Sequence, residues 1–251
     1  MIRTYIAGND GTERGAAAVR FANALAGATA ASVLEATAGP ESSPATSLHA
    51  TAEHREASLL IVGATHRGAV QRTVPGSVTA RLLHGAPCPV VAVPAEWTTT
   101  AGDDAAFRKI VVAFDEREPA RAALQYAADL AQELGATLEV VSVFEPVLAP
   151  YAGGIPTVDD RVNEELRAKL RDDLTEAVAA LPPEVDAHAR LLDGPPALAI
   201  EKAATGADLL VTGSRGLGPL RAVLVGSVSR HLVDHAPCPV LVVPRGVAVP
   251  A

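Results

Sequence analysis

The strongest constraint in this sequence is an internal repeat. Residues 57–93 match residues 207–243 without a gap, and the pentapeptide Ala-Pro-Cys-Pro-Val occurs at 86–90 and again at 236–240. Two copies of a segment of this length indicate that the chain folds into two similar units. A site that is complete in one copy therefore has a counterpart position in the other copy.

The two copies differ in length. Their front and back portions align, but their middles do not. Between Phe144 and Gly194 the second copy has 49 residues, whereas the first copy has seven residues between Ala36 and Pro44. The first copy is therefore expected to lack about one strand and one helix.

A polar segment separates the copies. The stretch 98–104, Thr-Thr-Thr-Ala-Gly-Asp-Asp, consists of small and polar residues without periodicity, which is typical of a linker. The sequence predicts a truncated first repeat at 1–94, a linker at 95–106 and a complete second repeat at 107–246.

Strand and helix patterns alternate along the second copy. Short apolar, β-branched runs predict buried strands, and apolar residues at helical spacing predict helices between them. The expected strands are 109–114, 137–144, 185–192, 208–212 and 239–243. The expected helices are 118–134, 158–181, 195–205 and 227–235, with a loop at 146–157. This alternation predicts an α/β fold, Rossmann-like in each repeat, with a parallel sheet flanked by helices.

In such a fold, ligands bind beyond the carboxyl ends of the strands. The segments that leave these ends begin at Asp115, Phe144 and Gly213. Gly213 opens a glycine-rich loop, Gly-Ser-Arg-Gly-Leu-Gly, and Gly226 and Ser227 open the last expected helix. The glycine-rich loop therefore lies where a site is expected.

This loop can form a backbone cradle for an anion. Glycines let main-chain N–H groups turn toward one point and let an anion approach closely. The helix that starts at Ser227 adds free N–H groups and the positive end of its dipole, and its hydroxyl can cap the helix or bond a phosphate. Arg215 can add positive charge. A tight turn between a strand and a helix has a similar composition, so both interpretations stay open.

The loop and its flanks resemble the universal stress protein family. The spacing Gly213-x2-Gly216-x9-Gly226-Ser227 is similar to the ATP-binding motif of that family, and so are the 207–211 strand and the Ala-Pro-Cys-Pro-Val-Leu-Val-Val-Pro ending. The resemblance implies a five-stranded parallel sheet in the complete repeat. It also implies dimer-like pairing through the last strands, and a regulatory role in stress rather than a metabolic reaction.

The resemblance also assigns roles to residues by position. It implies that Asp115 meets the ribose or adenosine end of ATP and that the Val143 backbone meets adenine. The residues it assigns to the phosphates are Gly213, Gly216, Gly226 and Ser227, beside Arg215. ATP is the expected cofactor, and Mg²⁺ is an optional companion ion.

Two departures from the family pattern affect these assignments. Glu116 and Arg117 stand where the family often has Gly-Ser, and a carboxylate near a polyphosphate is unfavourable unless Arg117 or a metal offsets it. In the first copy the Asp10-Gly11-Thr12 turn is closer to the family pattern, but His66 replaces the second loop glycine. We therefore expect the first site to be absent or altered.

Other motifs are incomplete. A hydrolase nucleophile elbow needs glycine two residues before its serine, and Thr212 stands there before Ser214. The loop lacks the Gly-Lys-Ser/Thr of a Walker A motif. His231 and His235 lie four residues apart on one expected helix, but no third metal ligand is evident.

Composition restricts the class of protein. The net charge of −8 disfavours nucleic-acid binding, because an acidic chain repels a phosphate backbone. No apolar stretch approaches the roughly 18 residues of a membrane span, and the first residues lack the layout of a signal peptide. These features predict a soluble cytoplasmic protein. Cys88 and Cys238 occupy equivalent positions and are expected to be small buried residues, not disulfide partners.

Three functional hypotheses follow. The leading one is a cytoplasmic ATP-binding regulatory stress protein, not an enzyme, with its main site in the second repeat. The alternative is an interaction module that binds no nucleotide, in which the first repeat serves as a built-in dimer partner and an unidentified protein is bound. The third is a nucleotide-hydrolysing enzyme, for which no base or metal cluster is evident near the loop. A homodimer stays open, because the two repeats can pair each other's edge strands.

Overall fold

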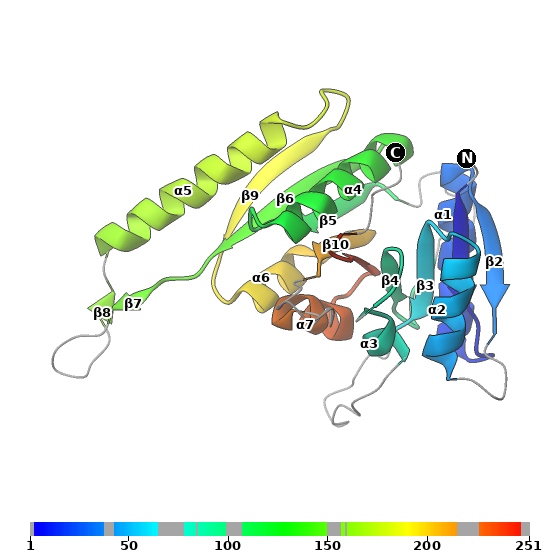
Figure 1. Cartoon of the computed structure of the whole chain (residues 1–251). Helices are drawn as coiled ribbons and strands as arrows, with labels where there is room; N and C mark the ends of the chain where they lie inside the picture. Colours follow the sequence, from blue (N-terminus) through cyan, green and yellow to red (C-terminus); the bar gives the residue numbers. More distant parts are fainter. Residues whose placement is uncertain are drawn as a thin grey trace.

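The computed structural model describes residues 3–37, 43–64, 78–83, 85–98, 107–149, 157–158, 160–214 and 226–246 (Figure 1). The first half of the chain contains β1 (Thr4–Gly8), α1 (Glu13–Thr29), β2 (Ser32–Ala36), α2 (Pro44–His54), β3 (Leu59–Gly63), α3 (Val78–Leu83) and β4 (Val90–Val93). The second half contains β5 (Lys109–Ala113), α4 (Glu118–Leu134), β6 (Thr137–Phe144), β7 (Leu148–Ala149), β8 (Thr157–Val158), α5 (Asp160–Ala179), β9 (Ala187–Asp193), α6 (Pro196–Ala203), β10 (Leu209–Gly213), α7 (Ser227–His235) and β11 (Val240–Val243).

One sheet of nine strands runs through both halves, in the order β2-β1-β3-β4-β11-β10-β5-β6-β9. Its two halves join where β4 and β11 pair antiparallel, with Leu241 opposite Val91. All other neighbours in this sheet pair in parallel. The α/β fold is therefore confirmed, and the last strands of the two halves pair as the resemblance implied.

In the described residues, the first half contributes one strand fewer to the nine-stranded sheet than the second half and has one helix fewer, as its sequence predicted. Strands β6, β5, β10 and β11 correspond to β2, β1, β3 and β4, which leaves β9 without a counterpart in the described part of the first half. Helix α5, which leads into β9, also has no counterpart there. The five strands that the second half contributes to the nine-stranded sheet form the parallel sheet expected of a complete repeat.

Helices cover both faces of the sheet. Buried residues of α1, α4 and α5 share one core cluster, and buried residues of α2, α3, α6 and α7 share the other. The helices bury mainly small residues, such as Ala123 and Ala127 of α4, against strands rich in valine. Small side chains allow helices to lie close to the sheet, which explains how a chain with few aromatic residues fills its core.

Local signals set the ends of the helices. Thr12 accepts a hydrogen bond from the backbone N–H of Gly15 and so caps α1. Helix α4 has Pro119 in its first turn. Its last residue, Leu134, is followed by Gly135, whose φ of 62° ends the helix. The bounds predicted for α4, β6 and α7 are confirmed to the residue.

The predicted loop at 146–157 is wrong in part, because β7 and β8 form a short antiparallel hairpin there. Each of these strands has two residues, which is too short to produce a period-two pattern in the sequence. Figure 1 shows the hairpin and the start of α5 projecting from the body of the molecule.

The start of the predicted linker packs against the first half. Trp97 contacts Phe21 of α1 edge to face, with ring centroids 5.1 Å apart, and Phe107 contacts the same ring at 5.4 Å. Residues 99–106 lie outside the described part of the chain, so the linker boundaries stay a prediction.

Both cysteines lie in the buried core, as their equivalent repeat positions predicted. Cys88 and Cys238 are buried free thiols, and burial raises the pKa of each to about 12.

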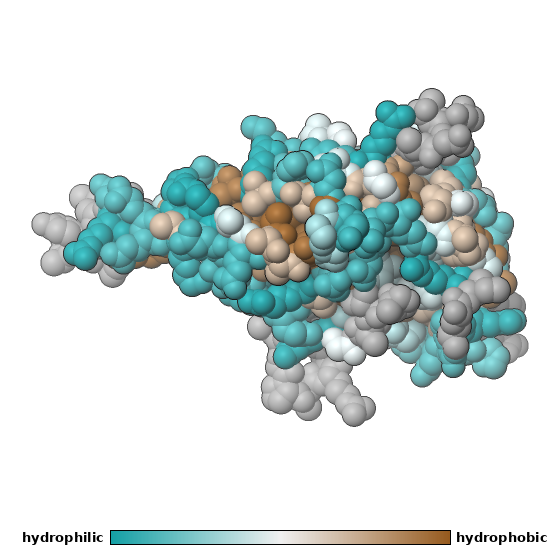
Figure 2. All heavy atoms as spheres, turned by 90° about the horizontal axis from the view of Figure 1, so that it is seen from above, coloured by the Kyte–Doolittle hydropathy of each residue, from teal (hydrophilic) through white to brown (hydrophobic). Residues whose placement is uncertain are grey.

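In the described residues, none of the helices has both the length and the apolar character that a membrane crossing requires. Seen from above, most of the visible face is hydrophilic, with hydrophobic side chains gathered near its middle (Figure 2).

Candidate functional site

Each half of the molecule has a cavity at the carboxyl ends of its strands. The first cavity, of about 340 Å³, is lined by residues from β1, β3 and the segments that follow them. The second cavity, of about 270 Å³, lies at the equivalent place in the second half. Both cavities are at the edge where ligands bind in parallel α/β sheets.

Three of the predicted site residues line the second cavity. Asp115 follows β5, Val143 is the next-to-last residue of β6, and Gly213 is the last residue of β10. These strands are neighbours in the order β10-β5-β6. Parallel pairing therefore brings together residues that lie up to 98 positions apart in the sequence.

Gly213 has a steric role that its sequence motif did not indicate. A Cβ at this position would lie 2.2 Å from the carbonyl oxygen of Pro119, in the first turn of α4. Gly63 of the first half is equally restricted, because its Cβ would lie 2.6 Å from the carbonyl oxygen of Arg14. In both halves the strand end therefore packs directly against a helix backbone, and only glycine fits.

The start of α7 forms another part of the second cavity. Gly226 is the residue before the helix and provides no side-chain cap, and Ser227 is the first helical residue. These two residues do not line the cavity, but the next two, Val228 and Ser229, do. Of the remaining predicted residues, Arg215 and Gly216 lie outside the described part of the chain.

Ser229 is a cavity residue that the sequence argument missed. Its hydroxyl donates to the carbonyl oxygen of Gly213 at 2.9 Å and so joins α7 to the end of β10. Thr79, at the same repeat position in the first half, donates to the carbonyl oxygen of Gly63 at 3.3 Å. A hydroxyl at both repeat positions was the signal that could have identified it.

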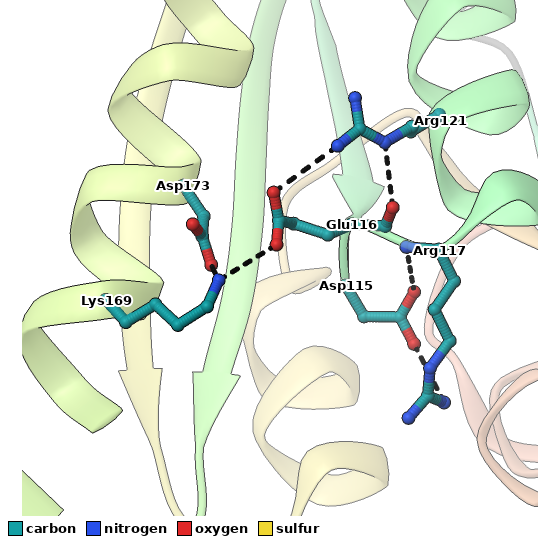
Figure 3. Close-up of polar contacts among 6 residues, drawn as sticks. All are labelled: Asp115, Glu116, Arg117, Arg121, Lys169 and Asp173. Carbon is teal, nitrogen blue, oxygen red and sulfur yellow. Dashed lines mark hydrogen bonds and ion pairs between the residues drawn. The ribbon is translucent and has the colours of Figure 1, made fainter. Parts of the chain in front are cut away.

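The turn after β5 carries two opposite charges toward the second cavity. Asp115 Oδ1 accepts from the backbone N–H of Arg117 at 3.3 Å, and its Oδ2 lies 3.4 Å from Arg117 Nη1 (Figure 3). Both side chains line the cavity. Asp115, the residue predicted to bind the ribose, is therefore paired with the neighbouring Arg117.

Glu116 points away from this pair, toward α4 and α5 (Figure 3). Its carboxylate lies 3.4 Å from Arg121 Nη2 and 3.0 Å from Lys169 Nζ. Lys169 also pairs with Asp173 at 2.6 Å, and the hydrogen bonds that Lys169 donates to Asp173 and then to Glu116 raise its pKa. The cations paired with Glu116 are therefore Arg121 and Lys169, whereas Arg117 pairs with Asp115.

The first cavity retains the turn that the sequence singled out. Asp10 accepts from the backbone N–H of Thr12 at 3.0 Å and from its hydroxyl, and the hydroxyl bond is the main reason that the pKa of Asp10 is lowered. Asp10 and Thr79 line this cavity. His66 lies outside the described residues. The described part of the first half keeps a cavity, and the expectation that its site is absent or altered stays a prediction.

The incomplete motifs gain no support. Ser214 is fully buried, and its Oγ accepts from the backbone N–H of Arg245 at 3.3 Å, so the hydroxyl is not exposed to a substrate. His231 Nε2 lies 2.6 Å from Glu201 Oε2, and His235 donates from Nδ1 to the carbonyl oxygen of His231. Over the residues described above, no group of three or more His, Cys, Asp or Glu side chains is placed to hold a metal.

Comparisons with known proteins agree with the fold. The model of the universal stress protein family matches residues 39–94 and 106–244. A curated relative from Thermus aquaticus, named universal stress protein in QAH/OAS sulfhydrylase 3'region, is 41% identical over 55% of this chain and 98% of its own length. A universal stress protein from Mycolicibacterium smegmatis is 32% identical over 75% of this chain, which spans 62% of that relative's length.

A solved structure covers nearly the whole chain. The crystal structure of a universal stress protein from Archaeoglobus fulgidus DSM 4304 matches with a TM-score of 0.64, over 97% of this chain and 98% of that one. Its sequence identity is 17%, so this likeness concerns the fold alone.

Proposed function

Because the chain belongs to the universal stress protein family, we propose that it is a regulatory stress-response protein that binds an adenine nucleotide in the second cavity. The observation that carries the proposal is that Asp115, Val143 and Gly213 line one cavity at the ends of three neighbouring strands. ATP is the nucleotide that the loop spacing favours. We place the protein in the cytoplasm, where its two free cysteines stay reduced.

The residues around the cavity suit an anionic nucleotide. Gly226 leaves α7 without a side-chain cap, which suits a helix start that binds an anion. Three carboxylates in and beside the turn after β5, those of Asp115, Glu116 and Asp173, each lie within 3.4 Å of a cationic side chain. These cations are Arg117, Arg121 and Lys169.

Each part of the nucleotide has a proposed partner. Asp115 would hold the ribose, and the Val143 backbone would hold adenine. Mg²⁺ would arrive with the triphosphate. The proposed phosphate ligands are Gly213, Arg215, Gly216, Gly226 and Ser227. We propose no catalytic role for these residues, and linear phosphate release that an Asp115→Ala change abolished would contradict this.

A calorimetric titration with Mg-ATP tests the location of the site. We expect one site per chain, and we expect Asp115→Ala to weaken binding about tenfold or more, since it removes a charged hydrogen-bond acceptor. Asp10→Ala is the matched control, because Asp10 is the equivalent residue of the first cavity. If Asp10→Ala abolishes binding and Asp115→Ala does not, the main site is in the first half. Two sites per chain would mean that both cavities bind.

The second candidate function is an interaction module that binds no nucleotide. The projecting segment at β7, β8 and α5 favours it, because Val147 and Val162 there are 49% and 46% exposed. A pull-down that depends on residues 146–160 but not on ATP would support this candidate. Saturable ATP binding at micromolar concentrations would contradict it.

A further inference from the structure

Helix α5 rests on the sheet with little apolar burial. Of its 20 residues, only Asn163 and Leu174 are buried. Leu170, however, lines the second cavity, so α5 forms part of the wall of the candidate site. An element with few buried apolar contacts opens locally at a low free energy, so a change in its polar contacts can change how often it opens.

These polar contacts lie around the mouth of the second cavity. Lys169 binds Glu116 in the turn after β5. Arg167 pairs with Asp193 at the end of β9, and its guanidinium carbon lies 4.3 Å from the ring centroid of Phe144, at the end of β6. The N-terminal half of α5 is therefore attached to the ends of β5, β6 and β9, and the ends of β5 and β6 also form part of the candidate site.

Glu116 has a backbone conformation that favours glycine. Its φ is 60°, and the equivalent residue of the first half is Gly11, with a φ of 74°. Side chains other than glycine rarely adopt this region. A glutamate at this position indicates that its side chain contributes more than a turn requires. In the first half, where α5 has no counterpart, the residue is glycine.

We propose that Glu116 is a positioning residue that attaches α5 to the turn carrying Asp115 and Arg117, and so couples occupation of the second cavity to the position of α5. The coupling part of this proposal rests on the proposed nucleotide binding. A ligand that contacts Asp115 changes the turn in which Glu116 lies, and Glu116 passes the change to Lys169. The second half alone has both the helix and the glutamate.

Hydrogen exchange of the α5 amides, read by mass spectrometry, tests the attachment. Glu116→Gly removes the carboxylate and gives the backbone its preferred residue, so the variant keeps the fold. Without ligand, we expect exchange over residues 160–179 to become about two- to fivefold faster, since exposed ion pairs are individually weak. Saturating Mg-ATP should slow this exchange in the parent protein and have no such effect in Glu116→Gly, although the variant still binds Mg-ATP by calorimetry.

Two further variants separate the loop contact from general effects on the helix. Lys169→Ala breaks the same contact from the α5 side and should reproduce the faster exchange. Asp173→Asn alters the other partner of Lys169 but keeps the contact to Glu116, so it should resemble the parent. Unchanged α5 exchange in Glu116→Gly, or equal acceleration by Asp173→Asn, overturns the proposal.

The two proposals fail in different ways. If the parent binds no Mg-ATP, the proposed nucleotide function and the coupling fail together, while exchange of the unliganded variants still decides whether Glu116 holds α5. If the parent binds Mg-ATP but α5 exchange does not respond, the nucleotide function stands and the coupling is wrong.

Discussion

At the scale of single residues, the most restricted position in the candidate site is Gly213. If Gly213 binds a phosphate, the close approach of that ligand is one reason for a glycine at this position. The structure gives a second reason, which is the packing of α4. The backbone of α4 passes so close that any Cβ would overlap the carbonyl oxygen of Pro119. Gly63 repeats the arrangement in the first half. Glycine at these positions is therefore required by the fold, whether or not a nucleotide binds.

We predict that Gly213→Ala lowers the free energy of unfolding by about 1–3 kcal/mol, because the clash is with backbone atoms that cannot move aside cheaply. Urea denaturation of the unliganded protein measures this. Gly27→Ala in α1 is the control, since a Cβ there meets nothing within 4 Å. Because alanine favours a helix, the control should be stabilised by about 0.5–1 kcal/mol. Equal stability of Gly213→Ala and the parent would show that α4 can shift.

The sequence could predict Asp115, Val143 and Gly213 as neighbours, because parallel strands end at one edge of a sheet. It could not predict the partners of Glu116. Lys169 lies 53 positions further along the chain, on a helix whose rotation about its axis depends on packing. A charge pattern read along one segment does not reveal a pair formed between two segments.

At the scale of elements, Glu139 joins three strands of the second half. It lies on β6, and its carboxylate accepts from Lys109 of β5 at 2.6 Å and from Arg190 of β9 at 2.8 Å. Partial burial acts to raise the pKa of Glu139, but the hydrogen bonds from Lys109 and then Arg190 outweigh it and lower the pKa below 4.5. The ionised form is therefore favoured in the folded protein.

A lowered pKa fixes the sign of the pH dependence. The stability from Glu139 is fully present above the unfolded value of 4.5 and is lost as the pH falls through the folded pKa. We predict that Glu139→Gln lowers the free energy of unfolding at pH 7 by about 1 kcal/mol. The difference from the parent should therefore narrow as the pH falls below 4.5. Denaturant titrations at pH 7 and pH 3.5 measure it, and a difference that grows on acidification would contradict the assignment.

Secondary structure followed from the sequence where the end signals were strong. Pro119 and Gly135 bound α4 at the predicted residues. The pairing of β7 with β8 did not follow, because two residues per strand give no pattern in the sequence. Helix α5 was predicted to extend to Leu181 but ends at Ala179, before the two prolines that the prediction used as its limit.

At the scale of the whole molecule, the two halves share one sheet. They also share both core clusters, one on each face of this sheet. The internal repeat predicted two similar units, and the family resemblance implied that they pair through their last strands, but neither predicted that this pairing is antiparallel. The pairing of β4 with β11 gives each half a partner for an otherwise exposed edge. The edges that remain are β2 and β9.

A shared core should make the halves unfold together, and the single tryptophan allows a direct test. Trp97 packs on Phe21 of the first half, and Phe21 also contacts Phe107 at the start of the second. We predict that Trp97 fluorescence and far-UV circular dichroism give coincident urea transitions.

Replacing Phe107 with alanine should lower the free energy of unfolding by about 3–5 kcal/mol, because it leaves a cavity between the halves. Both transitions should then move to lower urea by the same amount, since the lost contact belongs to a core that the halves share. A fluorescence transition that precedes the loss of helix signal would instead mean that the first half melts alone. In that case the second half, with its cavity, would stay folded while the edge of β11 became exposed. The first half would then protect that edge without being required for the fold of the second half.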